Sequence, residues 1–187
     1  FTGLVDETDL VYREGAPGPL SEVLGVFVEE TDALLPDEQN AVRFSDGSRA
    51  SARLLCDRIR LRGAEPIGFY ERAFYAGEPA ATRSACGSGV GYYLATYLDD
   101  SGLRAFLRSV CAERGITSPL AGGAEPPEGV EVAQRLQPDG RLLTYLLNHT
   151  EEERAVQMPS GGKDLLTGEA VGPRVTLEPL AVRIVAH

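Results

Sequence analysis

A run rich in proline and glycine, residues 117–129 (TSPLAGGAEPPEG), most constrains what this chain can fold into. Proline lacks a backbone donor and glycine loses much conformational freedom on folding, so the run favours neither a helix nor a strand. We therefore predict two domains, residues 1–118 and 129–187, joined by a linker over 119–128. The second domain is too short for a large core, so we expect it to depend on the first.

The segment before the linker mixes helix and strand patterns. Residues 101–114 place apolar side chains at the i, i+3, i+4, i+7 and i+8 positions of a helix, and Asp99 and Asp100 suit its start. Residues 17–25 predict a shorter helix that ends at Gly25. Strands are predicted at residues 3–5, 26–30, 53–62, 67–70, 80–85 and 90–96, with a hairpin turn at Asp46-Gly47. Together these patterns indicate an α/β domain.

The segment after the linker reads as all-β. Short apolar runs are separated by turn-prone groups such as residues 138–140 and 160–162. The predicted strands cover residues 130–136, 142–147, 154–158, 175–177 and 182–185. Strands so close in sequence favour an antiparallel meander or a small sandwich.

Charge and hydropathy exclude several functions. The chain has 28 acidic and 18 basic residues, a net charge of −10, with the acids spread along its length. Nucleic-acid binding requires a basic stripe, so no such partner is expected. No apolar run of about 18 residues is present, so no membrane span is expected. The first residues lack the pattern of a signal peptide, and Phe1 in place of an initiator Met indicates that the chain is processed or cut from a longer one.

The three cysteines, Cys56, Cys86 and Cys111, are far apart and form no CxxC pair. This usage is typical of reduced, mostly buried thiols and predicts a cytoplasmic protein. Residues 85–89 (ACGSG) resemble a nucleophile elbow around Cys86, but an elbow needs a following helix and a nearby base. A strand follows here, and the first domain has no histidine, so a hairpin turn is favoured. The same strand argues against residues 87–91 (GSGVG) as a phosphate loop.

Two pairs of adjacent acids could in principle act as a glycosidase acid and nucleophile. Glu29 and Glu30 are predicted on one strand, where neighbouring side chains point to opposite faces and cannot reach one bond. Asp99 and Asp100 are better placed beside the positive end of a helix. We expect all four to lie on the solvated surface.

Residues 146–154 (LLNHTEEER) admit three interpretations. Asn148-His149-Thr150 fits a glycan acceptor sequence, and His149 with Glu151–Glu153 could form a metal or acid/base cluster. The third interpretation is a hairpin turn between two strands. His187 is the only other histidine, and nothing at the start of the chain indicates secretion, so the hairpin turn is favoured.

Ordered motifs along the chain resemble a known family. Three of them, residues 146–150 (LLNHT), 163–168 (KDLLTG) and 177–184 (LEPLAVRI), are similar to the small C-terminal β domain of family 42 glycoside hydrolases, the bacterial β-galactosidases. Four earlier motifs resemble the later half of that family's trimerisation domain: residues 17–25 (PGPLSEVLG), 54–57 (LLCD), 74–77 (FYAG) and 92–96 (YYLAT).

The resemblance implies a fold and an assembly. The first domain is expected to be a partial glutamine-amidotransferase-like (Rossmann-like) α/β domain without that fold's catalytic cysteine and histidine, followed by a small antiparallel β-sandwich. The family's (β/α)₈ barrel, which bears two catalytic glutamates, does not fit in 187 residues with these domains. No catalytic, cofactor-binding or metal-binding residue is therefore assigned in this chain, and no cofactor is expected.

The function implied is that of a non-catalytic C-terminal region of a β-galactosidase. The parent would hydrolyse terminal non-reducing β-D-galactosides with retention, reaching its substrate only through the absent barrel. This region would serve oligomerisation, as a homotrimer in the parent, and structural support, with its interface before Thr117 and no activity of its own. The alternative is a stand-alone carbohydrate-binding or protein-interaction module. The chain lacks tryptophan, and six of its aromatics lie in or near predicted strands: Phe69, Tyr70, Phe74, Tyr75, Tyr92 and Tyr93.

Overall fold

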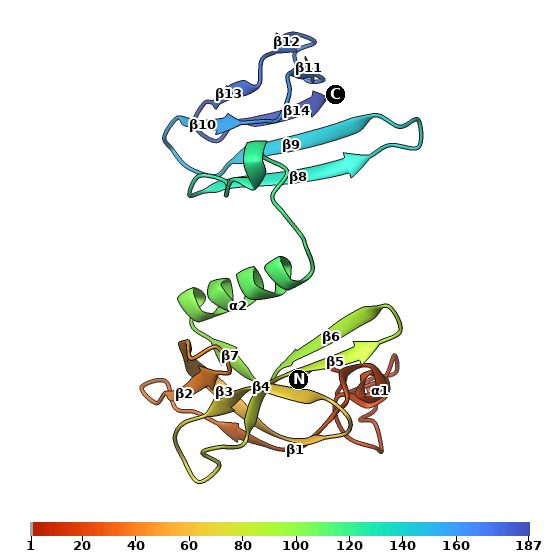
Figure 1. Cartoon of the computed structure of the whole chain (residues 1–187), viewed down its shortest axis with the longest axis vertical. Helices are drawn as coiled ribbons and strands as arrows, with labels where there is room; N and C mark the ends of the chain where they lie inside the picture. Colours follow the sequence, from red (N-terminus) through yellow and green to blue (C-terminus); the bar gives the residue numbers. More distant parts are fainter. Residues whose placement is uncertain (1) are drawn as a thin grey trace. The chain divides into compact units, whose positions relative to one another are not determined.

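The structure is a computed structural model that describes residues 2–187. It contains two compact units, Phe1–Val110 and Cys111–His187 (Figure 1). Each unit is built on antiparallel β-structure with its own buried core. Within residues 2–187, no helix is long and apolar enough to cross a membrane.

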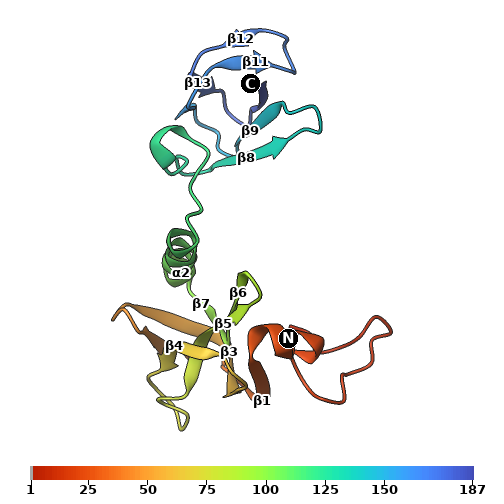
Figure 2. The same ribbon diagram turned by 45° about the vertical axis from the view of Figure 1, so that its right-hand side comes forward.

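The first unit contains a seven-stranded sheet in the order β1-β3-β2-β4-β5-β6, with β7 paired to β3. Every pairing in this sheet is antiparallel. The strands are β1 (Val26–Ala33), β2 (Asn40–Phe44), β3 (Arg49–Leu61), β4 (Glu65–Tyr70), β5 (Pro79–Cys86), β6 (Gly89–Leu94) and β7 (Thr96–Leu98). Figure 2 shows β3 and β5 running through the middle of this unit.

The expectation of a glutamine-amidotransferase-like (Rossmann-like) first domain is wrong for this chain. That fold requires parallel strands joined by crossover helices. Here the strands are antiparallel, and the described helices are η1 (Gly18–Leu20), α1 (Ser21–Leu24) and α2 (Asp100–Glu113). The helix pattern at 17–25 and 101–114 is itself confirmed, but neither helix connects two parallel strands.

Turn chemistry explains why several predicted elements are found where expected. Gly25 ends α1 in the left-handed conformation, with φ of 63°. Gly47 has φ of 87° in the β2–β3 turn, where the Asp46 carboxylate accepts a hydrogen bond from the Ser48 N–H at 2.9 Å. The strand predicted at residues 3–5 is wrong, since this segment forms only one isolated bridge, between Val5 and Val11.

The core of the first unit lies between the curved sheet and α2. Tyr70 and Tyr75 are almost fully buried and meet edge to face, with ring centroids 5.1 Å apart. On α2, Phe106 stacks on Phe44 of β2 at 5.9 Å. A Cβ on Gly102 would lie 2.3 Å from the Cβ of Ala50, so glycine allows the helix to approach the sheet closely.

The second unit is a small two-sheet sandwich, which confirms the antiparallel sandwich predicted for the C-terminal segment. One sheet has the order β12-β11-β14-β9-β8, and the other pairs β10 with β13. Its elements are η2 (Ala121–Gly123), β8 (Val130–Leu136), β9 (Leu142–Asn148), β10 (Arg154–Gln157), β11 (Gly162–Asp164), β12 (Ala170–Val171), β13 (Arg174–Leu177) and β14 (Val182–Ala186). Leu146 and Val185 from the larger sheet and Leu177 from the smaller one are fully buried in a shared core.

The expected hairpin at residues 148–154 is wrong in one respect. β9 pairs with β8 and β14, whereas β10 pairs with β13. The segment therefore carries the chain from one sheet to the other rather than turning it back on its neighbour. The strand β11 was not predicted because residues 160–162 read as a turn, and β12 was not predicted because it has only two residues.

Candidate functional site

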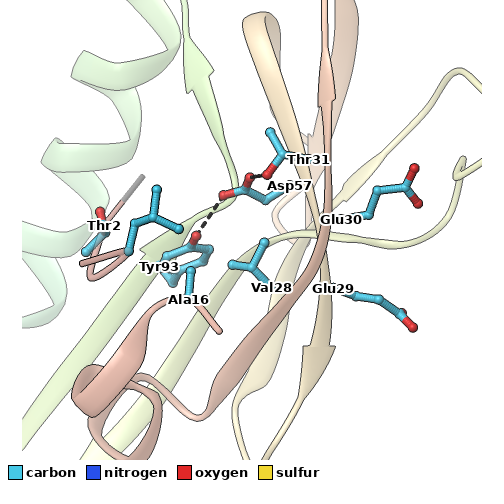
Figure 3. Close-up of a pocket in the computed structure, with 9 residues that line it drawn as sticks. Thr2, Ala16, Val28, Glu29, Glu30, Thr31, Asp57 and Tyr93 are labelled. Atoms are coloured by element: carbon cyan, nitrogen blue, oxygen red, sulfur yellow. Dashed lines mark hydrogen bonds between the residues drawn. The ribbon is translucent and has the colours of Figure 1, made fainter. Parts of the chain in front are cut away.

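The most enclosed acid of the first unit is Asp57 on the central strand β3. Its side chain is only 6% exposed, and its two oxygens accept hydrogen bonds from the hydroxyls of Thr31, at 2.6 Å, and Tyr93, at 2.8 Å (Figure 3). Its backbone N–H donates to the carbonyl of Ala95 at 2.6 Å. Strands β1, β3 and β6 thus bring three polar side chains together at one point of the sheet.

A pocket of about 210 Å³ opens over this group. A neighbouring recess of about 310 Å³ shares Thr2, Asp57 and Tyr93 with it. Burial, followed by the hydrogen bond to Asp57, raises the pKa of Tyr93 well above its ordinary value. Tyr93 therefore remains a neutral donor at physiological pH. Because hydroxyl groups occupy both oxygens of Asp57, the arrangement stabilises the sheet and offers no free base or nucleophile.

Two further tyrosine hydroxyls, those of Tyr70 and Tyr75, are neutral donors for the same reason. Tyr75 donates from its hydroxyl to Asp32 at 2.6 Å, and Tyr70 donates to the Ala95 carbonyl at 2.7 Å. Burial raises the pKa of both tyrosines, and it also raises the pKa of the Cys56 thiol. A thiol held protonated in this way is a poor nucleophile.

Glu29 and Glu30 do not point to opposite faces as predicted. A β-bulge falls between Val28 and Glu30, so the two glutamates reach Arg60 and Arg58, which share one face of β3. Arg58 lies 2.9 Å from Glu30, and the hydrogen bond from Arg60 lowers the pKa of Glu29. Figure 3 shows both carboxylates directed away from Tyr93. Glu29 is therefore an ionised acid held by arginine, whereas a glycosidase acid requires a raised pKa.

Asp99 and Asp100 begin α2, as the sequence indicates. Asp99 accepts hydrogen bonds from the Ser101 hydroxyl at 2.6 Å and the Ser51 N–H at 3.1 Å, and the first of these lowers its pKa. Asp100 is fully exposed, 3.6 Å from Arg53. Asp99 therefore connects the helix start to β3.

Cys86 is exposed in the turn between β5 and β6, which confirms the predicted hairpin. Gly87 adopts φ of 56° there, and no helix begins at Gly89 or Gly91. Both histidines of the chain lie in the second unit. Within residues 2–187, neither the helix nor the histidine that a nucleophile elbow or phosphate loop would use lies at this turn.

Asn148 is a structural side chain. It is 3% exposed, and its amide nitrogen donates to the carbonyls of Glu152 at 2.7 Å and Glu178 at 2.8 Å. Its amide oxygen accepts from the N–H and the hydroxyl of Thr150, at 3.0 and 2.8 Å. Glycosylation would require this nitrogen to be accessible, so the acceptor sequence is excluded by burial.

The histidines do not assemble a metal site. His149 lies 3.2 Å from Glu131, while His187 contacts Thr144 at 2.9 Å and the Gly161 carbonyl at 3.1 Å. Glu151–Glu153 are exposed. Among residues 2–187, no group of three or more histidine, cysteine or acidic side chains could hold a metal ion.

Sequence reasoning missed one buried ion pair in the second unit. Asp164 is 1% exposed and lies 2.7 Å from the guanidinium of Arg183. Burial alone would raise the pKa of Asp164, but the Leu166 N–H and Arg183 together lower it. The sequence pattern that could have indicated a structural role for Asp164 is residues 163–168, where this acid precedes a turn that ends in glycine.

Of the six aromatic residues considered for a sugar platform, only Phe74 is exposed, at 75%. It lies edge to face against Tyr75, and Arg58 sits 5.1 Å from its ring centroid. Among these six residues, the first unit therefore presents one exposed ring to a sugar rather than a platform of several rings.

Comparisons with known proteins match the whole of this architecture. Residues 1–117 match the model described as the β-galactosidase trimerisation domain, and residues 129–186 match that of the β-galactosidase C-terminal domain. Beta-galactosidase BglY of Alicyclobacillus acidocaldarius is 42% identical over 176 residues, covering 91% of this chain and 25% of that protein. Beta-galactosidase BgaA of Planococcus sp. is 38% identical over 100% of this chain and 28% of that protein.

Solved structures give the same result. The β-galactosidase from Bacillus circulans sp. alkalophilus superposes with a TM-score of 0.82 at 34% identity, over 100% of this chain and 28% of that one. The enzyme from Rahnella sp. R3 gives a TM-score of 0.78 at 30% identity, over 100% of this chain and 27% of that one. The chain thus spans about a quarter of the length of the relatives it matches.

Each antiparallel β unit keeps its most buried acid, Asp57 or Asp164, in internal contacts, and each unit matches a domain of the β-galactosidases compared above. The chain belongs to glycoside hydrolase family 42, and it matches the trimerisation and C-terminal domains, the non-catalytic region of these β-galactosidases.

Proposed function

We propose that this chain is the assembly and support region of a retaining β-galactosidase that hydrolyses terminal non-reducing β-D-galactosides. The observation that carries the proposal is the match of residues 1–117 to a trimerisation domain. The acid pair best suited to glycosidase chemistry, Glu29 and Glu30, is bound by arginines. The catalytic acid and nucleophile would therefore come from elsewhere in the parent enzyme.

The role of the first domain is self-association, as a homotrimer in the parent. We take it to span residues 1–118, with a linker over 119–128 and a C-terminal domain over 129–187. The matched segments, 1–117 and 129–186, leave the intervening residues to the linker. We also assign the protein to the cytoplasm, and the three free cysteines support this. The second domain is a structural support whose buried polar side chains, Thr144, Asn148 and Asp164, have partners within it.

Multi-angle light scattering of the 187-residue chain over a wide concentration range tests the assembly role. The expected result is a mass that rises with concentration toward three times that of one chain. A mass of one chain at every concentration would contradict it. Calorimetry against galactose and lactose addresses the alternative, a carbohydrate-binding module centred on Phe74, and saturable binding abolished by Phe74→Ala would favour that module.

A further inference from the structure

A small hairpin, residues 4–12, projects from the first unit and presents apolar side chains to solvent; we call it the arm. Figure 2 shows it as the red loop that extends away from the sheet. Four aliphatic residues of the arm are exposed: Leu4 at 36%, Val5 at 40%, Leu10 at 66% and Val11 at 63%. Single exposed aliphatics are ordinary, but four on one short hairpin mark an interaction surface.

The arm is held in one conformation by its own hydrogen bonds. The Tyr12 N–H donates to the Leu4 carbonyl at 3.1 Å, and the Asp6 N–H donates to the Leu10 carbonyl at 2.9 Å. The Asp6 carboxylate closes the turn by accepting from the N–H groups of Thr8, at 2.8 Å, and Leu10, at 3.1 Å. Such order before binding lowers the entropy cost of association.

The base of the arm packs closely on the first unit. A Cβ on Gly3 would lie 2.1 Å from the carbonyl oxygen of Pro17, and one on Gly18 would lie 2.4 Å from the ring of Tyr12. Both glycines have positive φ, 61° and 57°. The contacts fix the direction in which the exposed tip points.

Charge specifies the kind of surface that would accept this tip. Residues 4–14 contain four acids, Asp6, Glu7, Asp9 and Glu14, against the single base Arg13. A complementary surface is therefore an apolar depression with basic side chains beside it.

The first unit has such a depression, the recess of about 310 Å³ described above. Its apolar wall consists of Leu55, Leu94, Tyr97, Leu98 and Leu103. Tyr97 is 54% and Leu103 is 40% exposed. Arg104 follows Leu103 on the exposed side of α2, and Arg53, the cross-strand partner of Tyr97, lies 3.6 Å from the exposed Asp100. Among the described residues that line the recess, Asp57 is the one acid, and it already accepts two hydrogen bonds.

Threefold assembly requires two different surfaces on each copy, because an interface between identical patches closes a dimer instead. We propose that the arm of one copy inserts Leu10 and Val11 into the recess of a second copy, between Tyr97 and Leu103. The proposal rests on the self-association proposed above. The arm contact specifies how the copies associate: each copy binds the next head to tail, and the interface repeats around a ring.

The first test compares Leu10→Asp and Val11→Asp with Leu136→Asp by sedimentation velocity. Leu136 is 73% exposed in the second unit and so provides a matched control. Each arm variant is expected to weaken self-association about 10- to 100-fold, since it places a charge in an apolar contact, while the control is unchanged. Circular dichroism establishes that all three variants fold.

The outcomes separate this contact from the proposed function. A wild-type chain that stays monomeric contradicts self-association itself and, with it, the contact. If the wild-type chain and the arm variants associate with the same affinity, the proposed contact between arm and recess is wrong, while self-association itself stands.

The second test is directional. A Leu10→Cys variant and a Leu103→Cys variant, both carrying Cys86→Ser and Cys111→Ser, are treated with a short bismaleimide separately and as a mixture. The cross-linked dimer is expected only in the mixture, because Leu10 of one copy meets Leu103 of the next. Cross-linking of the Leu10→Cys variant with itself would indicate a symmetric dimer and overturn the proposal. A mixture that yields no more product than the parent carrying Cys86→Ser and Cys111→Ser would overturn it as well.

Discussion

The side-chain amide nitrogen of Asn148 lies 2.8 Å from the carbonyl oxygen of Glu178, thirty residues further along the chain. Asn148 ends β9, and Glu178 follows the last residue of β13, so one amide connects the two sheets of the second unit. Replacing Asn148 with Asp would turn this donor into a carboxylate that faces carbonyl oxygens. We expect the free energy of unfolding to fall by about 2–4 kcal/mol at neutral pH.

Urea unfolding at pH 7 measures this loss. Gln157→Glu makes the same amide-to-acid change on an exposed side chain of β10 and should stay within about 0.5 kcal/mol of the wild type. Equal effects of the two substitutions would contradict the structural role of Asn148.

The buried pair Asp164–Arg183 should make the stability of the second unit depend on pH. Because the folded pKa of Asp164 lies below its unfolded value, the pair stabilises the fold above about pH 4, and this contribution disappears as the pH falls through the folded pKa. Asp164→Asn should cost about 3 kcal/mol at pH 7, since it leaves Arg183 without its counter-ion, and much less at pH 3.

Thermal unfolding from pH 3 to pH 7 tests this prediction. Asp139→Asn is the control, because Asp139 pairs with Arg141 where both side chains are more than half exposed. It should change the unfolding profile far less, because solvent screens this exposed pair. If the unfolding temperature of Asp164→Asn changes with pH in parallel with that of the wild type, the pair contributes nothing to the pH dependence of stability.

Gly25 should not tolerate a side chain. Its φ is 63°, and a Cβ would lie 2.7 Å from the backbone nitrogen of Ala64. Gly25→Ala is expected to lose about 1–3 kcal/mol from the left-handed backbone alone, with the contact adding to this. Gly89→Ala, where a Cβ comes no closer than 3.5 Å to any atom outside its neighbours, should unfold close to the wild-type temperature. Similar melting temperatures for the two variants would contradict the packing at α1.

The thiols should react in an order set by burial. Cys86 is exposed in its turn, whereas Cys56 is fully buried and burial raises its pKa. Iodoacetamide should therefore label Cys86 in the native chain and reach Cys56 only after denaturation. Mass spectrometry of peptides at successive times measures the order, and early labelling of Cys56 would mean that β3 is not in the core.

Much of the local structure could be predicted from the sequence, because it depends on local chemistry. The apolar stripe on residues 101–114, the turn at Asp46-Gly47 and five of the seven strands after the linker were placed within a few residues. The pairing of strands could not be predicted, since it depends on contacts distant in sequence. The Rossmann-like expectation therefore failed although its helices were correct.

Two further errors have specific physical causes. A bulge at Glu29 reverses the alternation on which the opposite-face prediction depended. At Asn148 the turn residues indicated that the chain changes direction. They did not indicate that the next strand, β10, pairs with β13 in the second sheet. Asp57 was not singled out, because the single acid of an arginine-rich strand gives no signal until Thr31 and Tyr93 are brought beside it.

The central claim is that this chain supports a β-galactosidase without catalysing its reaction. Hydrolysis of a chromogenic β-galactoside by the purified 187-residue chain tests it most directly, with a full-length relative such as BglY as the positive control. The account predicts no release of chromophore above the rate in buffer, for the wild type and for Glu29→Gln and Glu30→Gln alike. Turnover by the wild type that is abolished by either substitution would contradict it.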